Sequence, residues 1–114
     1  MEIEDIIVKI KLANDMQKEK GLRAFAKIKI PLEFNKYGKK YISIKGFIIW
    51  GNSEYYDEIR GYCSVTPPSV DKEVGKPLRL VFIENESFKA DISFWREFTK
   101  HILRAYYKKI EEPH

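Results

Sequence analysis

Two sets of basic residues recur at regular intervals along the sequence, and each set would form one row of cations on a regular element. One row recurs at every fourth position and consists of Arg96, Lys100, Arg104 and Lys108. On a helix this spacing forms a slowly drifting stripe. The other row alternates with apolar residues and consists of Lys9, Lys11, Arg23, Lys27 and Lys29. Cations spaced along rigid elements can neutralise phosphates and release counterions, so both rows predict a nucleic-acid-binding surface.

Aromatic side chains fall among these cations. Phe25 lies within the second row, and Lys45 is expected to share a strand face with Tyr41 and Phe47. Aromatic rings beside cations can stack on unpaired bases. The alternative is that the cations form an ordinary solvated surface and that the helix or a second subunit covers Phe25 and Phe47. The sequence leaves both interpretations open.

The residue patterns of common enzyme sites are absent from the sequence. His101 and His114 form neither an HxxxH nor an HExxH pattern, so a helical zinc site would lack ligands. No glycine-rich phosphate loop exists, and the carboxylates are scattered. A Cys63–His101 dyad is the remaining catalytic alternative, but Cys63 alternates with Gly61 and Val65 and is expected to face the core. We expect no enzyme activity, no metal and no cofactor.

The positive charge is concentrated in one third of the chain. The net charge of the 114 residues is +4, while residues 9–45 hold eleven Lys and Arg against three acidic residues. A segment of this charge attracts polyanions. A length of 114 residues and an apolar content of 44% are typical of one domain with one core, residues 1–114. They exclude collagen, low-complexity disorder and coiled-coil rods.

Three features indicate where the protein acts. The sequence contains no run of about 18 apolar residues, the length that could span a membrane. The acidic opening with Glu2, Glu4 and Asp5 is unlike a signal peptide. The single cysteine, Cys63, cannot form an internal disulfide, which excludes cysteine-rich extracellular scaffolds and cysteine zinc fingers. We expect a protein of the reducing cytoplasm with no membrane contact and no small-molecule substrate.

A period of two dominates the first three-quarters of the chain. It predicts strands at residues 6–12, 22–32, 41–50, 59–66 and 78–83. The segments between them are expected to be loops, and the charged loop at residues 69–76 is expected to be mobile. In the third strand, the central candidate, one face is expected to hold Ile42, Ile44, Ile48 and Trp50. The opposite face is expected to hold Phe47 and Ile49.

The period changes to three and four near the C-terminus. Trp95, Phe98, Ile102, Tyr106 and Ile110 define one face of a predicted helix. Asp91 or Ser93 is the expected N-cap, and both Trp50 and Trp95 are expected in the core. The predicted fold is α+β, an antiparallel five-stranded meander sheet with one C-terminal helix packed on it.

The order of several short motifs resembles the SpoVG family (stage V sporulation protein G), bacterial regulators linked to septation. The chain opens Met-Glu-Ile-Glu-Asp-Ile-Ile-Val at residues 1–8, and residues 23–30 read Arg-Ala-Phe-Ala-Lys-Ile-Lys-Ile. Residues 45–51 match an Ile-rich strand ending in Gly, residues 61–67 a strand ending in Pro, and residues 103–106 read Leu-Arg-Ala-Tyr. The sequence departs from the family where Ser69-Val70-Asp71 replaces its basic loop and where its His-Pro-Ile is missing.

The resemblance implies a small DNA- and RNA-binding protein that acts as a dimer without catalysis. Its basic helix region maps onto Arg96, Lys100, Arg104 and Lys108, with Lys89 leading into it. An exposed edge strand would explain a homodimer, because unpaired backbone groups invite a partner.

A dimeric nucleic-acid-binding regulator is therefore the predicted function. Its predicted site residues are Lys27, Lys29, Lys45, Lys89, Arg96, Lys100, Arg104 and Lys108. The alternative is a non-catalytic protein-interaction module, in which the long loops with Tyr55 and Tyr56 and the second apolar face of the third strand engage a protein partner.

Overall fold

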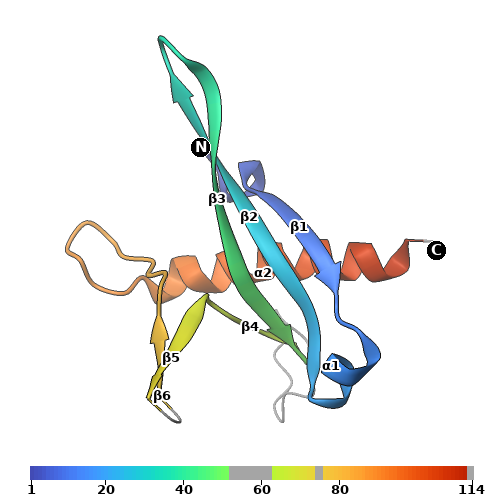
Figure 1. The fold of residues 1–114 in the computed structure, drawn as a ribbon. Coiled ribbons are helices and arrows are strands. Elements are labelled where there is room, and N and C mark those ends of the chain that lie inside the picture. The colour runs from blue at the N-terminus through green and yellow to red at the C-terminus, as the bar shows by residue number, and fades with distance from the viewer. Residues whose placement is uncertain (52–62, 74–75, 113–114) are drawn as a thin grey trace.

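The computed structural model of this chain describes residues 1–51, 63–73 and 76–112, and its core is one helix on one sheet. The four-stranded sheet has the order β1 (Ile7–Leu12), β2 (Leu22–Phe34), β3 (Gly38–Trp50) and β4 (Ser64–Thr66), and all neighbours are antiparallel. The helix α2 (Ile92–Glu111) lies across one face of this sheet (Figure 1). The α+β class with an antiparallel sheet and a C-terminal helix is thus confirmed.

The expected five-stranded meander is wrong, because β5 (Ser69–Glu73) and β6 (Lys76–Arg79) form a separate two-stranded sheet. The expected loop at residues 69–76 contains β5, and the expected strand at residues 78–83 ends at Arg79. Pro67 and Pro68 lack the amide donors that would continue β4, and the amide of Leu80 donates to the Pro68 carbonyl (2.8 Å). The first part of the expected fourth strand, residues 59–62, lies outside the described residues, as does the expected loop at residues 52–58.

The β2–β3 hairpin is longer than the sequence pattern predicts. Both strands have 13 residues, and the turn between them is only three residues long. Its outer end, residues 33–43, is exposed throughout and projects beyond the rest of the molecule (Figure 1). We call this end the hairpin arm.

A β-bulge in β3 reverses the expected faces of its second half. Ile28 lies opposite Ile44, but Ala26 lies opposite Phe47, so Lys45 and Gly46 occupy the space of one residue. Gly46 has a φ of +100°, which glycine adopts without the steric cost of a Cβ. Phe47 and Ile49 consequently enter the core with Ile44, whereas Ile48 and Trp50 turn to the other face. The expected grouping of Ile42, Ile44, Ile48 and Trp50, and that of Lys45 with Phe47, is therefore wrong.

The core lies between α2 and the inner face of the sheet. Its buried members include Ala24, Ala26 and Ile28 from β2, Phe47 and Ile49 from β3, and Phe98, Ile102, Leu103 and Tyr106 from α2. The alanines are small enough to let the helix approach the middle of the sheet closely. Each fully buried large apolar side chain contributes about 1.5–3 kcal/mol. The ring centroids of Phe98 and Phe47 lie 5.7 Å apart in the edge-on arrangement that aromatic pairs favour.

Capping side chains start both α-helices. Asp91, as expected, caps α2 by accepting a hydrogen bond from the Phe94 amide (2.9 Å). Asn14 caps the short helix α1 (Asp15–Glu19), which occupies a segment expected to be a loop. The 3-10 turn η1 (Ile3–Asp5) precedes β1. A ring nitrogen of His101, Nε2, lies 2.7 Å from the Ile6 carbonyl oxygen and ties α2 to the start of β1.

Candidate nucleic-acid interface

The face of the four-stranded sheet that α2 does not cover carries most of the predicted sheet cations. On β2 the buried residues alternate with partly exposed ones, so Lys27 and Lys29 point away from the helix. On β1 the exposed residues of the same face include Lys9 and Lys11. We call this surface the open face and define its lysines as the open-face lysines: Lys9, Lys11, Lys27, Lys29 and Lys45.

The strand register brings like charges together on the open face. Lys9 lies directly opposite Lys27, and the bulge places Lys45 on the far side of Lys27. Like charges directly opposite each other destabilise a sheet. A shallow hollow of about 300 Å³ is lined by Lys9, Ile10, Lys11, Phe25, Ala26, Lys27, Lys45 and Gly46. No carboxylate of the described residues lines this hollow.

Phe25 is one of the residues that line this hollow, and it is partly exposed. In the register it stands between Lys11 on β1 and Ile48 on β3. Of the two phenylalanines for which the sequence left covering by the helix open, Phe47 is buried under α2, whereas Phe25 belongs to the open face. The open face therefore presents an aromatic ring beside Lys11 of the neighbouring strand and Lys27, two residues further along β2.

A second hollow continues the open face beyond Ile48. It measures about 390 Å³ and is lined by Ile48, Trp50, Thr66, Pro67, Ser69 and Arg79. Trp50, expected in the core, is only partly buried here, and its indole Nε1 donates a hydrogen bond to Thr66 Oγ1 (3.0 Å). Because the bulge turned Trp50 outward, this surface carries a second aromatic ring and a further cation, Arg79.

The predicted helix stripe lies on the opposite side of the molecule. The buried face of α2 points to the sheet, whereas Arg96, Arg104 and Lys108 are exposed and Lys100 is partly exposed. Lys89 is exposed in the segment that precedes α2. The structure therefore does not unite the stripe with the open-face lysines within one protomer.

The C-terminal end of the stripe approaches the open-face lysines at the free edge of β1. A hollow of about 410 Å³ there is lined by Val8, Lys9, Ile10, Ala105, Lys108, Lys109 and Glu112. Lys9 also lines the hollow of the open face, so Lys9 and Lys108 link the sheet to the end of the helix. Lys109 is paired with Glu112 (3.5 Å), which makes Lys108 the more available cation of this corner.

The predicted site residues are available to a partner. Within residues 1–51, 63–73 and 76–112, none of the eight forms a salt bridge. In the described residues, neighbouring carboxylates therefore do not pair with these cations.

Arg23 is a cation that the structure separates from the open face. Its guanidinium influences the pKa of Tyr106, a residue of α2 that is 8% exposed. Burial raises the pKa of Tyr106 above its ordinary value, the nearby Cys63 also raises it, and Arg23 lowers it. A register shift between Leu22 and Ala24 accounts for the different direction of Arg23.

The catalytic alternative has little geometric support. Cys63 is partly buried against the core, and the His101 ring is engaged with the Ile6 carbonyl. In the described part of the chain no three His, Cys, Asp or Glu residues cluster as a metal site would require.

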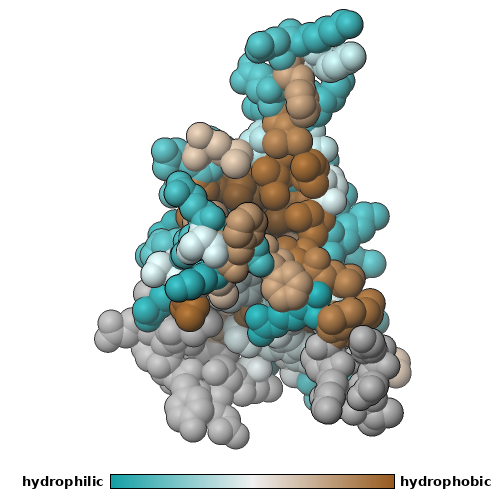
Figure 2. Space-filling model, turned by 90° about the vertical axis from the view of Figure 1, so that its left-hand side faces the viewer, coloured by the Kyte–Doolittle hydropathy of each residue, from teal (hydrophilic) through white to brown (hydrophobic). Residues whose placement is uncertain are grey.

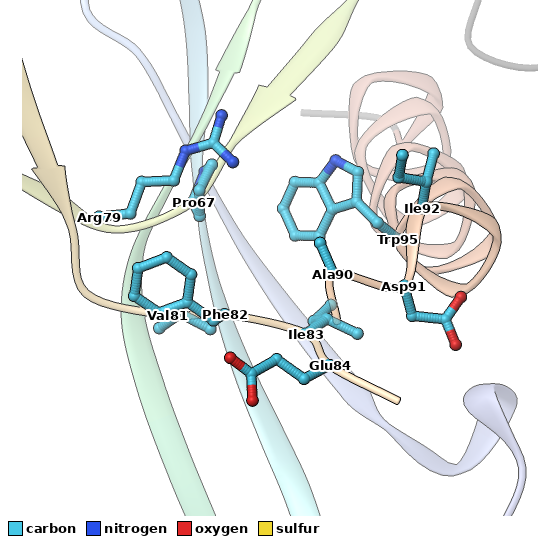
Figure 3. A pocket seen from close by; sticks show the side chains of 10 residues that line it. All are labelled: Pro67, Arg79, Val81, Phe82, Ile83, Glu84, Ala90, Asp91, Ile92 and Trp95. Carbon is cyan, nitrogen blue, oxygen red and sulfur yellow. The ribbon is translucent and has the colours of Figure 1, made fainter. Parts of the chain in front are cut away.

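A small pocket lies where β6 leads into α2. It measures about 140 Å³ and is lined by Pro67, Arg79, Val81, Phe82, Ile83, Glu84, Ala90, Asp91, Ile92 and Trp95 (Figure 3). Arg79 reaches toward the Trp95 indole from one wall, and Glu84 stands at the opposite end. Apolar surface runs through the middle of this side of the molecule (Figure 2). Phe82 and Ile92 are 66% and 76% exposed.

Comparison with known proteins gives no relative: no protein-family model, curated protein or solved structure matches this chain. No helix in the described ranges is long and apolar enough to cross a membrane.

Lys9 and Lys11 lie on the open face, although the predicted set of site residues does not include them. Their alternation with Val8, Ile10 and Leu12 shows from the sequence that they share a face. Which strand they pair with is not visible in that pattern, and only the pairing of β1 with β2 places Lys9 beside Lys27.

Proposed function

We propose that this protein is a small bacterial regulatory protein of the SpoVG type that binds the phosphate backbone of DNA or RNA in the cytoplasm. It acts without catalysis and without a cofactor. The open-face lysines provide the main contacts, and the helix stripe of Arg96, Lys100, Arg104 and Lys108, with Lys89, provides further ones.

One observation carries this proposal, namely that Lys9 and Lys27 face each other beside Lys45 with no described carboxylate lining their hollow. The repulsion costs folding free energy, about 0.2–1 kcal/mol for a directly opposed pair. A polyanion removes that cost on binding. Phosphates bound by lysines release their counterions, which adds a favourable and strongly salt-dependent contribution.

A salt titration of binding tests the proposal. Wild-type protein should retard a DNA fragment of arbitrary sequence at about 50 mM salt, and log affinity should fall steeply with log salt, by about 0.7–0.9 per phosphate contact. The triple variant K9Q/K27Q/K45Q should lose about two to three units of that slope. Absence of binding at low salt would refute the proposal.

A control variant removes the same charge elsewhere. K36Q/K39Q/K40Q deletes three exposed cations from the hairpin arm. It should lower affinity less than the open-face triple variant and leave most of the slope. Equal losses in the two triple variants would show that net charge alone, and not the open face, governs binding.

A homodimer through an edge strand completes the proposal, and the β5–β6 sheet is the best-supported contact. A two-stranded sheet alone is marginally stable. Its cross-strand pair of Val70 and Leu78 is 48% and 46% exposed. Pairing with a second copy would extend this sheet and cover that pair. The edge of β1 is less suitable, because Lys9 and Lys11 beside the same residues of a second copy would repel.

A protein-interaction module is the second candidate function, and the apolar side seen in Figure 2 favours it. Leu80, Phe82, Phe88 and Ile92 are all more than half exposed. Exposed apolar patches of this kind mark contact surfaces. The predicted contacts of Tyr55 and Tyr56 lie outside the described residues. The same salt titration separates the candidates, because a module of this class would not bind DNA at low salt.

A further inference from the structure

We infer that the open face selects single-stranded nucleic acid, with an unpaired base stacked on Phe25 and its phosphates held by the open-face lysines. This inference rests on the proposed function and adds the class of nucleic acid and the surface that reads it. Stacking on an aromatic ring accepts any base, so the selection is for single strands and not for a sequence.

The arrangement of side chains on the open face carries the first step. Lys9, Lys27 and Lys45 form a row across three strands, and the next row across the same strands is Lys11, Phe25 and Ile48. Neighbouring strands are about 4.8 Å apart and alternate residues of a strand about 7 Å apart. Phosphates held by the first row therefore leave their attached base within reach of the Phe25 ring.

The hollow over Phe25 carries the second step. Its volume of about 300 Å³ is at the lower end of small-ligand sites, large enough for one base. The glycine of the bulge adds no side chain to this hollow. The hollow is lined by four lysines and one aromatic ring, a combination that complements a base attached to a phosphate chain.

Base pairing decides between single and double strands. The bases of a duplex are stacked on one another, so their faces cannot reach Phe25. A duplex can contact only the lysines, whereas a single strand gains both the lysine contacts and the stacking. The hollow beside Trp50 and Arg79 extends the same surface by a second aromatic ring, which gives a path for several nucleotides across β2, β3 and β4.

Fluorescence anisotropy tests the inference with an oligothymidylate of about 12 nucleotides and a duplex of the same length at about 50 mM salt. Wild type should bind the single strand more tightly. F25L should weaken single-strand binding about five- to fiftyfold and leave duplex binding unchanged. F88L is the matched control, since Phe88 is 84% exposed in the segment before α2, and it should change neither affinity.

The outcomes separate the two proposals. Binding of neither probe at low salt refutes the proposed function and the inference together. Lysine-dependent binding of both probes with equal affinity, or equal losses for both probes in F25L, overturns the inference and leaves the proposed function standing.

Photocrosslinking keeps the test decisive if F25L does not fold. Wild-type protein is irradiated with a bromouridine-substituted single strand and digested with trypsin, which cuts after Arg23 and Lys27. The crosslink should map to residues 24–27. A crosslink confined to residues 97–100 of α2 would overturn the inference.

Discussion

The opposed lysines of the open face lower the stability of the free protein but favour the binding of a polyanion. K27Q keeps the aliphatic stem but removes the charge opposite Lys9, so it should stabilise the free protein by about 0.2–1 kcal/mol. Urea unfolding in the absence of nucleic acid measures this gain. K40Q is the control, because Lys40 lies on the same hairpin opposite Leu32, not opposite a cation. A K27Q variant that is less stable than K40Q would contradict the like-charge argument.

Gly46 is the single residue on which the two faces of β3 depend. A Cβ at this position would lie 3.2 Å from the Cβ of Pro68. An alanine here would also have to adopt a φ of +100°, which residues with a side chain rarely do. G46A should therefore destabilise the fold by about 1–3 kcal/mol. G38A shares the positive φ of +75° but has no neighbour within 4 Å, so it should cost less. Equal losses of unfolding free energy would show that the Pro68 contact is unimportant.

Tyr106 is expected to lower the stability of the fold at alkaline pH. Its pKa in the folded state is raised above the ordinary value of 10.0, mainly by burial. Above that pH the unfolded chain loses the phenol proton more readily than the folded chain, so stability falls as pH rises through the folded pKa. Urea unfolding from pH 8 to 11 should show a steeper loss for wild type than for Y106F. Curves that stay parallel above pH 10 would contradict the assignment.

Among the elements, α2 was the most predictable and β3 the least. The recurrence of Phe98, Ile102 and Tyr106 and the cap at Asp91 are local signals that the structure confirms, whereas Ile110 of the same predicted face is 44% exposed. The bulge at Gly46 arises from pairing with β2 and contact with Pro68, which no periodicity within β3 can show. One extra residue exchanges the faces of all that follow, which is why Phe47 and Trp50 were both misplaced.

The two sheets were misjudged for a related reason. The expected loop at residues 69–76 has the charged composition of a loop, but its first part, residues 69–73, forms β5 and pairs with β6. The candidate site was predictable in its residue types, since Lys27, Lys29 and Lys45 do lie on one surface. The sequence did not show that these lysines and the helix cations lie on different sides of the molecule, because α2 covers the other face of the sheet.

The helix stripe can be tested as an element separately from the sheet. R96A/K100A/R104A should lower affinity for unrelated sequences by similar factors, because phosphate contacts carry no sequence information. Since the stripe faces away from the open face, this variant should keep the preference for single strands over duplex. Competition binding with both probes measures the ratio. A lost preference would place the bases on α2, and unchanged affinity in a folded variant would remove the stripe from the interface.

Two copies joined through β5–β6 would carry two open faces, and this sets how the whole molecule binds. Light scattering should give twice the 13.5 kDa mass of the chain for wild type, and L78K should give the monomer because it places a charge in the proposed contact. I42K is the control, since Ile42 is 48% exposed on the hairpin arm against 46% for Leu78.

A nucleic-acid strand long enough to reach both open faces should bind the dimer at least about a hundredfold more tightly than the L78K monomer, because the second contact is intramolecular. A strand covering one face should bind both forms with the same intrinsic affinity. A dimeric L78K, or a wild type whose affinity ignores strand length, would place the partner copy on a different surface.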